Sequence, residues 1–348
     1  MSLYPLKFKP RFLEKIWGGR KLETVLGKSL PPEKLIGESW ELYDFPPGVI
    51  EGSGDEWTSA EIANGALAGR SLHWVVQEFG RDLMGDVALT GEHGQFPILI
   101  KFLDAREDLS VQVHPDQEYA QSHPGAHLKS EAWYVMQHDA GARLLKGLVP
   151  GATRSDFEAA TVVGGVDRLI KTIPAKVGDC HYLPSGTVHA LGAGMLVAEV
   201  QTPSDTTFRL FDFNRIDATT GKPRKLHVNE ALACIDFSGA PEPAQKRSHV
   251  AGFHTTVSQL VNSPYFKIEK VRFTEGVEEP VPYDEPVVWM MLEGEAQVKV
   301  DGVKEPTRFA KGDTVLLPAA MKDPVIKTIK DCVWLEVTFP TEANRPAV

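Results

Sequence analysis

The chain has 348 residues, of which 42% are hydrophobic and 24% charged, a composition typical of a globular protein with about two domains. Asp and Glu (47) outnumber Lys and Arg (37), and the resulting net charge of −10 argues against a nucleic-acid partner and an anionic membrane surface. Three cysteines lie far apart without a CxxC spacing, which argues against a disulfide framework and a zinc finger. No apolar run reaches membrane-spanning length, and the first residues lack a signal-peptide core, so we expect a cytoplasmic protein.

Short apolar runs separated by 25 Pro and 30 Gly residues predict a mainly β fold. The predicted strands, in chain order, cover 96–103, 110–113, 131–136, 142–148, 180–183, 195–201, 207–213, 266–273, 287–294, 296–300, 314–318 and 333–339. Helical spacing is rarer. It predicts a helix over 71–85 that begins at Ser71, one at the start of 155–170 that breaks at Gly164–Gly165, and a short one over 227–235.

A weak internal repeat divides the chain. The segments "EAWYVMQHDAGARLLKGL" (131–148) and "KVGDCHYLPSGTVHAL" (176–191) are echoed by "VVWMMLEGEAQVKV" (287–300) and "KGDTVLLPAAMKD" (311–323). Strands of this length with Gly-Asp and Pro turns favour a double-sheet jelly roll, the cupin barrel. We therefore predict a cupin domain with an N-terminal extension and helical insertions over 1–240, and a second cupin-like domain over 241–348. The seam should lie near 238–248, a stretch rich in Pro, Ala and charge.

The stretch "SVQVHPDQEYA" (110–120) is the first candidate site. As a strand it would place Val111 and Val113 on one face and Ser110, Gln112 and His114 on the other, before Pro115 ends it. One interpretation is a sheet face exposed to water. The other is a buried polar face, which would require partners for the amide and the imidazole.

A second motif, "GDCHYLPSGTVHALGAG" (178–194), predicts a strand, a tight turn at Pro184-Ser185-Gly186 and a returning strand with His189. In a cupin barrel His189 would face the strand of Gln112 and His114, with Glu131 on the next strand. Two imidazoles, a carboxylate and an amide oxygen suit Zn²⁺ or another divalent cation. His181 is a rival ligand. The other histidines considered are expected at the surface or in the core: His123, His138, His249 and His254.

Cations gather in the same segments. Lys101 interrupts the apolar run "PILIKFL", where an unpaired ammonium would be costly to bury, and Lys129 precedes Glu131 by two residues. Arg209 and Arg215 would lie on one side of a continuous strand, although Arg215 can equally form surface salt bridges. A divalent metal beside such cations suits an anionic, polyhydroxylated substrate such as a sugar phosphate, with Ser110 as an additional donor.

At these residues the chain resembles the type I mannose-6-phosphate isomerases of the short bacterial kind, essentially from end to end. The motifs that carry the resemblance are "EKIWGG" (14–19), "GESWEL" (37–42), "KFLDAREDLSVQVHPDQEYA" (101–120), "KSEAWYV" (129–135), "GDCHYLPSGTVHAL" (178–191) and "SDTTFRLFDFNR" (204–215). The resemblance implies one Zn²⁺ held by Gln112, His114, Glu131 and His189. It also implies Ser110 and Lys129 near the substrate phosphate, and Lys101, Asp205 and Arg209 around the sugar.

The activity implied is interconversion of mannose 6-phosphate and fructose 6-phosphate through an enediol or enediolate. Arg209 would stabilise the enediolate, and the base that removes the C2 proton stays open between Lys101, Lys129 and Asp205. Two rival functions remain: a cupin dioxygenase or oxidase that uses Fe(II) or Mn(II), against which the cations weigh, and a cupin that only binds sugar phosphates. A monomer and a homodimer are equally compatible with the sequence.

Two departures from the family pattern matter. Longer members carry a His immediately before the lysine that matches Lys129, and here that position is Leu128. The C-terminal repeat has Met321 and Lys322 where a ligand His would be expected. We therefore predict that the second barrel binds no metal and has a structural role.

Overall fold

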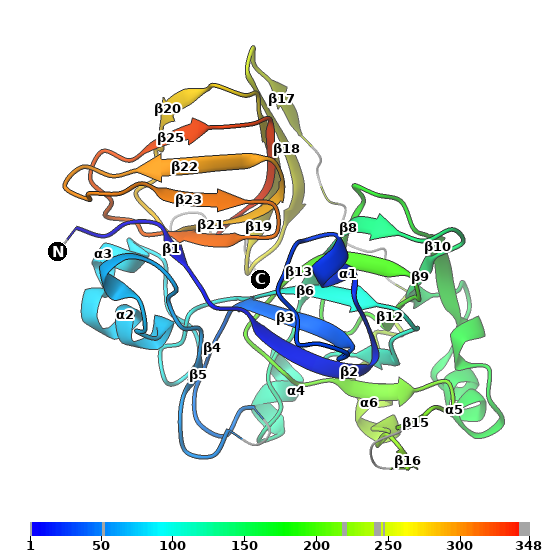
Figure 1. Ribbon diagram of the computed structural model, residues 1–348. Helices are drawn as coiled ribbons and strands as arrows, with labels where there is room; N and C mark the ends of the chain where they lie inside the picture. Colours follow the sequence, from blue (N-terminus) through cyan, green and yellow to red (C-terminus); the bar gives the residue numbers. More distant parts are fainter. Residues whose placement is uncertain (1, 51–52, 218–220, 240–244, 246–247, 341–348) are drawn as a thin grey trace.

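The computed structural model describes residues 2–50, 53–217, 221–239, 245 and 248–340. It consists mainly of β-strands arranged in two groups (Figure 1). The strands after residue 248 gather at the upper left of the figure, and most of the earlier strands gather at the lower right, with helices around them. The predicted mainly β class is therefore confirmed.

Two sheets form the first group. The six-stranded sheet has the order β11 (Cys180–Leu183), β8 (Glu131–His138), β13 (Met195–Gln201), β6 (Leu99–Ala105), β3 (Ile36–Leu42) and β2 (Arg11–Gly19). The five-stranded sheet has the order β10 (Ile170–Pro174), β9 (Arg143–Leu148), β12 (His189–Leu191), β7 (Val111–Val113) and β14 (Phe208–Phe211). All neighbours in both sheets are antiparallel, as is typical of jelly rolls.

The second group also has two larger sheets. The seven-stranded one has the order β1 (Leu6–Lys7), β24 (Thr314–Leu317), β21 (Val287–Glu293), β26 (Cys332–Thr338), β19 (Lys267–Phe273), β18 (Thr255–Asn262) and β17 (His249–Ala251). The four-stranded one has the order β20 (Glu278–Pro280), β25 (Val325–Thr328), β22 (Glu295–Lys299) and β23 (Thr307–Ala310). Two small ribbons complete the strands: β4 (Asp44–Phe45) with β5 (Thr58–Ser59), and β15 (Ile216–Asp217) with β16 (Lys222–Pro223).

The helices are short and lie outside the sheets (Figure 1). They are α1 (Lys21–Thr24), α2 (Leu72–Phe79), α3 (Arg81–Met84), α4 (Gln117–Ser122), α5 (Arg154–Val163) and α6 (Val228–Cys234), with 3₁₀ turns η1 (Gly65–Leu67) and η2 (Val166–Leu169). Ser71 caps α2 as predicted, since its hydroxyl accepts a hydrogen bond from the Trp74 amide. The helix predicted over 71–85 is interrupted, however, because Gly80 adopts φ 44° between α2 and α3.

Every predicted strand corresponds to an observed one, with ends shifted by up to three residues. The largest shift is at 96–103, where β6 begins only at Leu99 and continues to Ala105. The N-terminal strands β2 and β3 were not predicted. β3 is buried along its whole length although it carries two glutamates and a serine, so a pattern of alternating polarity could not identify it.

The internal repeat is visible in the strand registers. In the first group Trp133 of β8 pairs with Glu199 of β13, and the indole Nε1 donates to the Glu199 carboxylate over 2.8 Å. In the second group Trp289 of β21 pairs with Glu336 of β26, and its Nε1 donates to that carboxylate over 3.0 Å. The next strands also correspond, because Leu183 lies opposite Glu131 and Leu317 lies opposite Val287.

The two groups share one hydrophobic core, which includes Phe102 and Val200 of the first and Val261 and Phe266 of the second. β1, from the N-terminus, pairs with β24 among the C-terminal strands. The predicted seam at 238–248, with the boundary at 240/241, falls largely on residues 240–244 and 246–247, which lie outside the described residues. The division into domains 1–240 and 241–348 therefore stays a prediction.

Two further observations concern membrane-crossing helices and disulfide bonds. Among the described helices, none combines the length and the apolar character that crossing a bilayer requires. No disulfide joins the three cysteines, all of which lie within the described residues.

Candidate metal and substrate site

The polar face of the first motif is buried. Val111 and Val113 pack in a hydrophobic cluster on one side of β7, while Ser110, Gln112 and His114 on the other side are 3%, 9% and 1% exposed. The interpretation of this face as a solvated surface is therefore wrong. A buried face of this kind requires partners for its polar groups, and the neighbouring strands provide them.

The strand register places the second motif beside the first. In the five-stranded sheet His189 of β12 and Arg209 of β14 are the partners of Gln112 on its two sides. The turn predicted at Pro184-Ser185-Gly186 is present, closed by a 3.1 Å hydrogen bond from Thr187 to Pro184, with Gly186 at φ 82°. The Gly186 amide donates to the carbonyl of His114 over 3.0 Å, which fixes the turn against the first motif.

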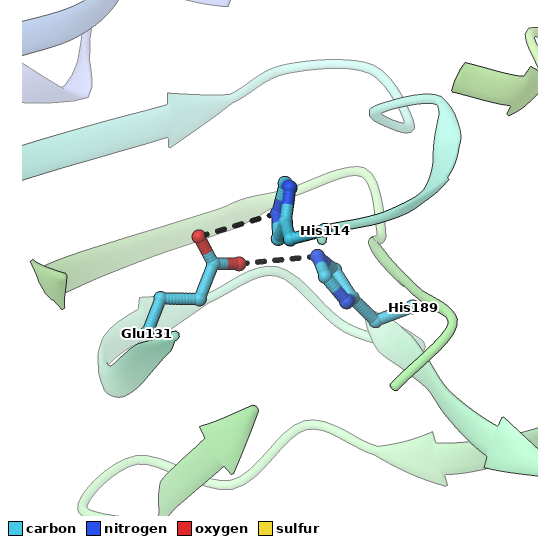
Figure 2. Close-up of side chains that lie close together, drawn as sticks. All are labelled: His114, Glu131 and His189. Atoms are coloured by element: carbon cyan, nitrogen blue, oxygen red, sulfur yellow. Dashed lines mark ion pairs between the residues drawn. The ribbon is translucent and has the colours of Figure 1, made fainter. Parts of the chain in front are cut away.

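Side chains from both sheets meet at one point. Figure 2 shows the Glu131 carboxylate directed at both imidazoles, with His189 Nε2 at 3.1 Å from Oε1 and His114 Nε2 at 3.5 Å from Oε2. One potential ligand atom from each of the three residues lies within 4.8 Å of the others. Gln112 Nε2 is 3.4 Å from His189 Nε2, so the amide lies at the same point. His181 is not part of this group.

Backbone contacts orient both imidazoles. Nδ1 of His114 lies 3.0 Å from the carbonyl of Thr206, and Nδ1 of His189 lies 2.8 Å from the carbonyl of Thr187. A carbonyl can only accept, so each Nδ1 carries a proton, and Nε2 is the nitrogen that each ring directs at the cluster. This is the arrangement of metal-binding histidines whose second nitrogen is held by the protein.

The electrostatics of the cluster also favour a cation. Burial, reinforced by the nearby Lys129 ammonium, lowers the pKa of His114 to about 3, so its imidazole is neutral at physiological pH. Burial opposes the charge of Glu131, but the coulombic attraction of Lys129 outweighs it and holds the pKa of Glu131 well below its ordinary value. The site therefore presents a neutral His114 imidazole and an ionised Glu131 carboxylate, the protonation states that metal ligands have.

Three atoms of the cluster lack ordinary partners. His114 Nε2 and both Glu131 oxygens are buried and meet hydrogen-bond geometry with no other group in the described part of the chain. Lys129 Nζ lies 2.8 Å from Glu131 Oε2, but as an ion pair without hydrogen-bond geometry. Buried polar atoms that converge without partners are costly unless a ligand satisfies them, so this donor set fits a divalent metal ion.

A cavity of about 340 Å³ adjoins the cluster. It collects most of the residues that the sequence pointed to: Lys101, Ser110, Gln112, Lys129, Asp205 and Arg209. Arg209 reaches across the first motif, since its Nε donates to the Ser110 hydroxyl over 3.2 Å. No ion pair joins Asp205 to Arg209 among the residues that the structure describes.

Lys101 is buried between two carboxylates. Its Nζ lies 3.4 Å from Glu38 Oε2 and 3.5 Å from Glu199 Oε2, and it lies 5.0 Å from the centre of the Trp40 ring. Burial opposes its charge, but Glu38, Glu199 and Asp205 outweigh burial and raise the pKa of Lys101. Its ammonium is therefore protonated at neutral pH, which removes the condition under which it could act as a base.

Arg215 does not line the cavity. β14 ends at Phe211, and Phe213 and Asn214 adopt φ 52° and 54°, so Arg209 and Arg215 do not share a continuous strand. The Arg215 guanidinium contacts the Asp212 carboxylate and the Asp108 carbonyl. In its place Arg224 lines the cavity, and its Nε donates to Asp212 over 2.8 Å.

Sequence reasoning missed several residues of the cavity wall: Lys15, Trp17, Glu38, Glu199, Arg224 and His227. Glu199 gave the same signal as Lys101, a charge inside the apolar run "MLVAEVQ". Lys15, Trp17 and Glu38 belong to motifs noted for their resemblance but without an assigned role. Arg224 and His227 gave no signal, because neither belongs to a motif with a recognisable spacing of site residues.

In this jelly roll, two imidazoles from one sheet and a carboxylate from the other form a buried, metal-competent cluster. The protein is therefore a cupin with a candidate metal site. Comparison with known proteins makes the assignment specific. Residues 6–142 match the catalytic-domain model of type I phosphomannose isomerase. A mannose-6-phosphate isomerase of Streptococcus mutans is 34% identical over 320 residues, 91% of this chain and 93% of that protein.

The mannose-6-phosphate isomerase ManA of Bacillus subtilis is 33% identical over 337 residues, 96% of this chain and 99% of that protein. A crystal structure of mannose 6-phosphate isomerase from Bacillus subtilis superposes with a TM-score of 0.83 at 31% identity, covering 97% of this chain and all of that one. The chain belongs to the type I mannose-6-phosphate isomerase family. The resemblance inferred from the motifs is thereby confirmed.

Proposed function

We propose that this protein interconverts mannose 6-phosphate and fructose 6-phosphate. The observation that carries the proposal is a single cavity in which Lys101, Lys129 and Arg209 adjoin a metal-competent cluster, in a chain of this family. Cations neutralise a sugar phosphate, and the cluster lies beside them to bind sugar oxygens.

The reaction moves a proton between C2 and C1 of the open-chain sugar and passes through an enediolate. Lys101, which stays protonated at neutral pH, suits stabilisation of negative charge on O1 or O2. Of the bases left open by the sequence, Asp205 is the one we propose, since it lines the cavity as a carboxylate. Glu199 is a second candidate that the structure adds, because burial and the neighbouring Glu131 raise its pKa and it lines the same cavity.

We propose Zn²⁺ as the metal, held by His114, Glu131, His189 and the side-chain oxygen of Gln112. The donors support this choice, because two imidazoles with a carboxylate suit Zn²⁺ better than the all-oxygen sites of Mg²⁺ or Ca²⁺. When bound, the ion would supply a Lewis acid for sugar oxygens.

We propose that the strands after residue 248 form a second, degenerate cupin-like barrel that binds no metal. Its support is the repeated register, in which the Trp289–Glu336 pair corresponds to Trp133–Glu199 and the apolar Val287 occupies the position of Glu131. Its role would be structural, through the shared core. A cytoplasmic location and a monomer or homodimer remain our expectations.

The decisive experiment is a coupled assay on chelator-stripped protein. Fructose 6-phosphate formed from mannose 6-phosphate is measured before and after Zn²⁺ is restored, for the wild type and for His114→Ala. Activity should return with Zn²⁺ in the wild type only, and His254→Ala, an exposed histidine among the C-terminal strands, is the matched control that should behave like the wild type.

Folding of His114→Ala is verified by circular dichroism, with Glu131→Gln as a second variant that keeps nearly the same volume. A folded wild type that binds Zn²⁺ but converts no mannose 6-phosphate would overturn the proposed function. Full activity without metal would overturn the role assigned to the cluster.

A further inference from the structure

We propose that Arg224, held in place by Asp212, binds the substrate's phosphate together with Arg209 and Ser110, and is the residue by which the enzyme selects phosphorylated sugars. This inference rests on the proposed function. Sequence reasoning placed the phosphate at Ser110, Lys129 and Arg215, and the contacts around Asp212 point to a different partner for Ser110.

Asp212 fixes the direction of Arg224. The Asp212 side chain is 5% exposed and accepts hydrogen bonds from Nε and Nη2 of Arg224 and from Nη2 of Arg215. Two donors of the Arg224 fork are therefore engaged, while its Nη1 makes no hydrogen bond to any described residue. A guanidinium held at one edge and lining a cavity presents its remaining donors in a defined direction, as recognition of a phosphate requires.

Arg209 lies on the same wall and is held in a similar way. Its Nε donates to Ser110 Oγ, and its Nη1 donates to the Lys225 carbonyl over 3.0 Å. The hydroxyl of Ser110 still has its proton to donate, because in this contact it accepts. Arg209, Arg224 and Ser110 thus contribute three sets of donors to one end of the cavity.

Around Asp212, positive side chains outnumber negative ones. Three guanidinium groups, Arg209, Arg215 and Arg224, surround one carboxylate, Asp212. Burial first, and then repulsion from Arg224 and Arg215, lower the pKa of Arg209 to about 10, so the arginine is still charged at neutral pH. An excess of partly buried positive charge is unfavourable without a counter-ion, and a dianionic phosphate would supply one.

The Lys129 ammonium is already compensated. Its Nζ lies 2.8 Å from the carboxylate of the metal-competent Glu131. In the described part of the chain Arg224 forms an ion pair only with Asp212, which it shares with Arg215. Lys129 is therefore better suited to the sugar oxygens beside the cluster than to the phosphate.

The spacing of residues along β7 agrees with a phosphate at Ser110 and sugar oxygens beside the cluster. Ser110 and Gln112 lie two residues apart on one face, which corresponds to about 7 Å along an extended strand. A phosphate at Ser110 would leave the sugar carbons extending toward Gln112 and the cluster. The two positions along β7 are thus separated by a distance comparable to the length of a hexose.

The experiment compares Arg224→Ala and Arg224→Lys with the wild type on mannose 6-phosphate. Removing a charged hydrogen-bond donor from the phosphate should raise KM by about 10- to 100-fold and change kcat much less. Lysine should restore part of the affinity, because it returns the charge without the fork. Competitive inhibition by inorganic phosphate, the probe for this end of the cavity, should weaken by a similar factor.

Lys225→Ala is the matched control, since it removes a positive charge next to Arg224 that does not line the cavity, and its kinetics should match the wild type. Zinc content is measured for each variant, because a merely structural effect would reduce metal content and kcat together. An unchanged KM and an unchanged inhibition by phosphate in Arg224→Ala would overturn the inference.

Failure of the proposed function can be distinguished from failure of the inference about Arg224. The first would appear as an inactive wild type, and calorimetric titration with inorganic phosphate would still decide the role of Arg224. Phosphate binding that weakens in Arg224→Ala but not in Lys225→Ala supports the inference. Equal binding by both variants and the wild type contradicts it.

Discussion

Trp133 connects the candidate metal site to the buried charges behind it. Its indole Nε1 donates to Glu199 over 2.8 Å, and its ring packs edge-on against His189 with the centroids 5.2 Å apart. Glu199 in turn lies 3.5 Å from Lys101. One side chain thus fixes both an imidazole of the cluster and a carboxylate of the cavity wall.

Trp133→Phe keeps an aromatic ring but leaves Glu199 Oε1 without its donor. We expect the free energy of unfolding to fall by about 1–3 kcal/mol, the cost of an unsatisfied buried acceptor, and Zn²⁺ affinity to fall because the smaller phenyl ring packs less closely against His189. Chemical denaturation and competition with a zinc-binding dye measure the two effects.

Trp289→Phe provides the comparison for this substitution, because Trp289 makes the equivalent bond to Glu336 among the C-terminal strands. It should cost somewhat less stability, because Trp334 Nε1 also donates to Glu336, and it should leave Zn²⁺ affinity unchanged. Equal losses of affinity in the two variants would show that the effect of Trp133 is not local.

The ionisation of Asp212 should make the free energy of unfolding depend on pH. Burial opposes its charge, but hydrogen bonds from Arg224 and Arg215 outweigh burial and hold the pKa of Asp212 below its ordinary value. In the unfolded chain its pKa is about 3.9, so as the pH falls the unfolded state takes up the proton first. The stabilising contribution of Asp212 is therefore complete above about pH 5 and is lost as the pH falls through the lower, folded-state pKa.

The measurement is the free energy of unfolding of the wild type and of Asp212→Asn between about pH 6 and pH 3. The wild type should be the more stable protein at pH 6, and the difference should shrink toward pH 3. A difference that grows on acidification would mean that Asp212 is not held in its ionised form by the two arginines.

At the scale of single elements, β7 shows how one short strand serves two purposes. Its odd-numbered residues Val111 and Val113 pack in the hydrophobic cluster, and its even-numbered Gln112 faces the site together with Ser110 and His114 at its ends. Because side chains alternate along a strand, a shift of one residue in register would exchange the two faces. The pairing of Gln112 with His189 and Arg209 fixes the register.

The helices contribute stability away from the site. Ser71 caps α2 through the Trp74 amide, and Ser71→Ala should lower the free energy of unfolding by about 1 kcal/mol with no change in kcat or KM. Ser122→Ala is a suitable comparison, since the Ser122 hydroxyl donates to carbonyls of the last turn of α4 and caps no amide, so its effect should be smaller. A larger effect for Ser122 in denaturant titrations would contradict this interpretation of the two serines.

At the scale of the molecule, the metal would connect two sheets. His114 and His189 are carried by the five-stranded sheet and Glu131 by the six-stranded sheet, so a bound ion links elements that otherwise meet through side-chain packing. A ligand that binds only the folded state stabilises it, by about 2.7 kcal/mol at one hundred times its dissociation constant.

Chelator-stripped protein should therefore melt at a lower temperature than protein with excess Zn²⁺, as measured by differential scanning calorimetry. Glu131→Gln, which lacks the ligand from the six-stranded sheet, should show a much smaller difference between the two conditions. A shift of equal size in both proteins would indicate that Zn²⁺ stabilises the fold from another position.

The β class, the position of most strands and the four residues proposed as metal ligands could be predicted from the sequence. These features depend on local rules: alternation along a strand, glycine and proline at turns, and residue types with the chemistry of ligands. They also fall within motifs shared with the family, which is why residue type and spacing were enough to identify His114, Glu131 and His189.

Which charges face the cavity could be established only from the folded structure. Glu38, Glu199 and Arg224 join it from three segments far apart in the chain, and Arg215 is directed away because the backbone turns at Phe213 and Asn214. The contacts of Lys101 with carboxylates on other strands also determine its pKa. Burial in an apolar strand alone would lower that pKa, and the surrounding carboxylates raise it. Such contacts depend on strand register and on loop conformation, which residue spacing along one segment does not encode.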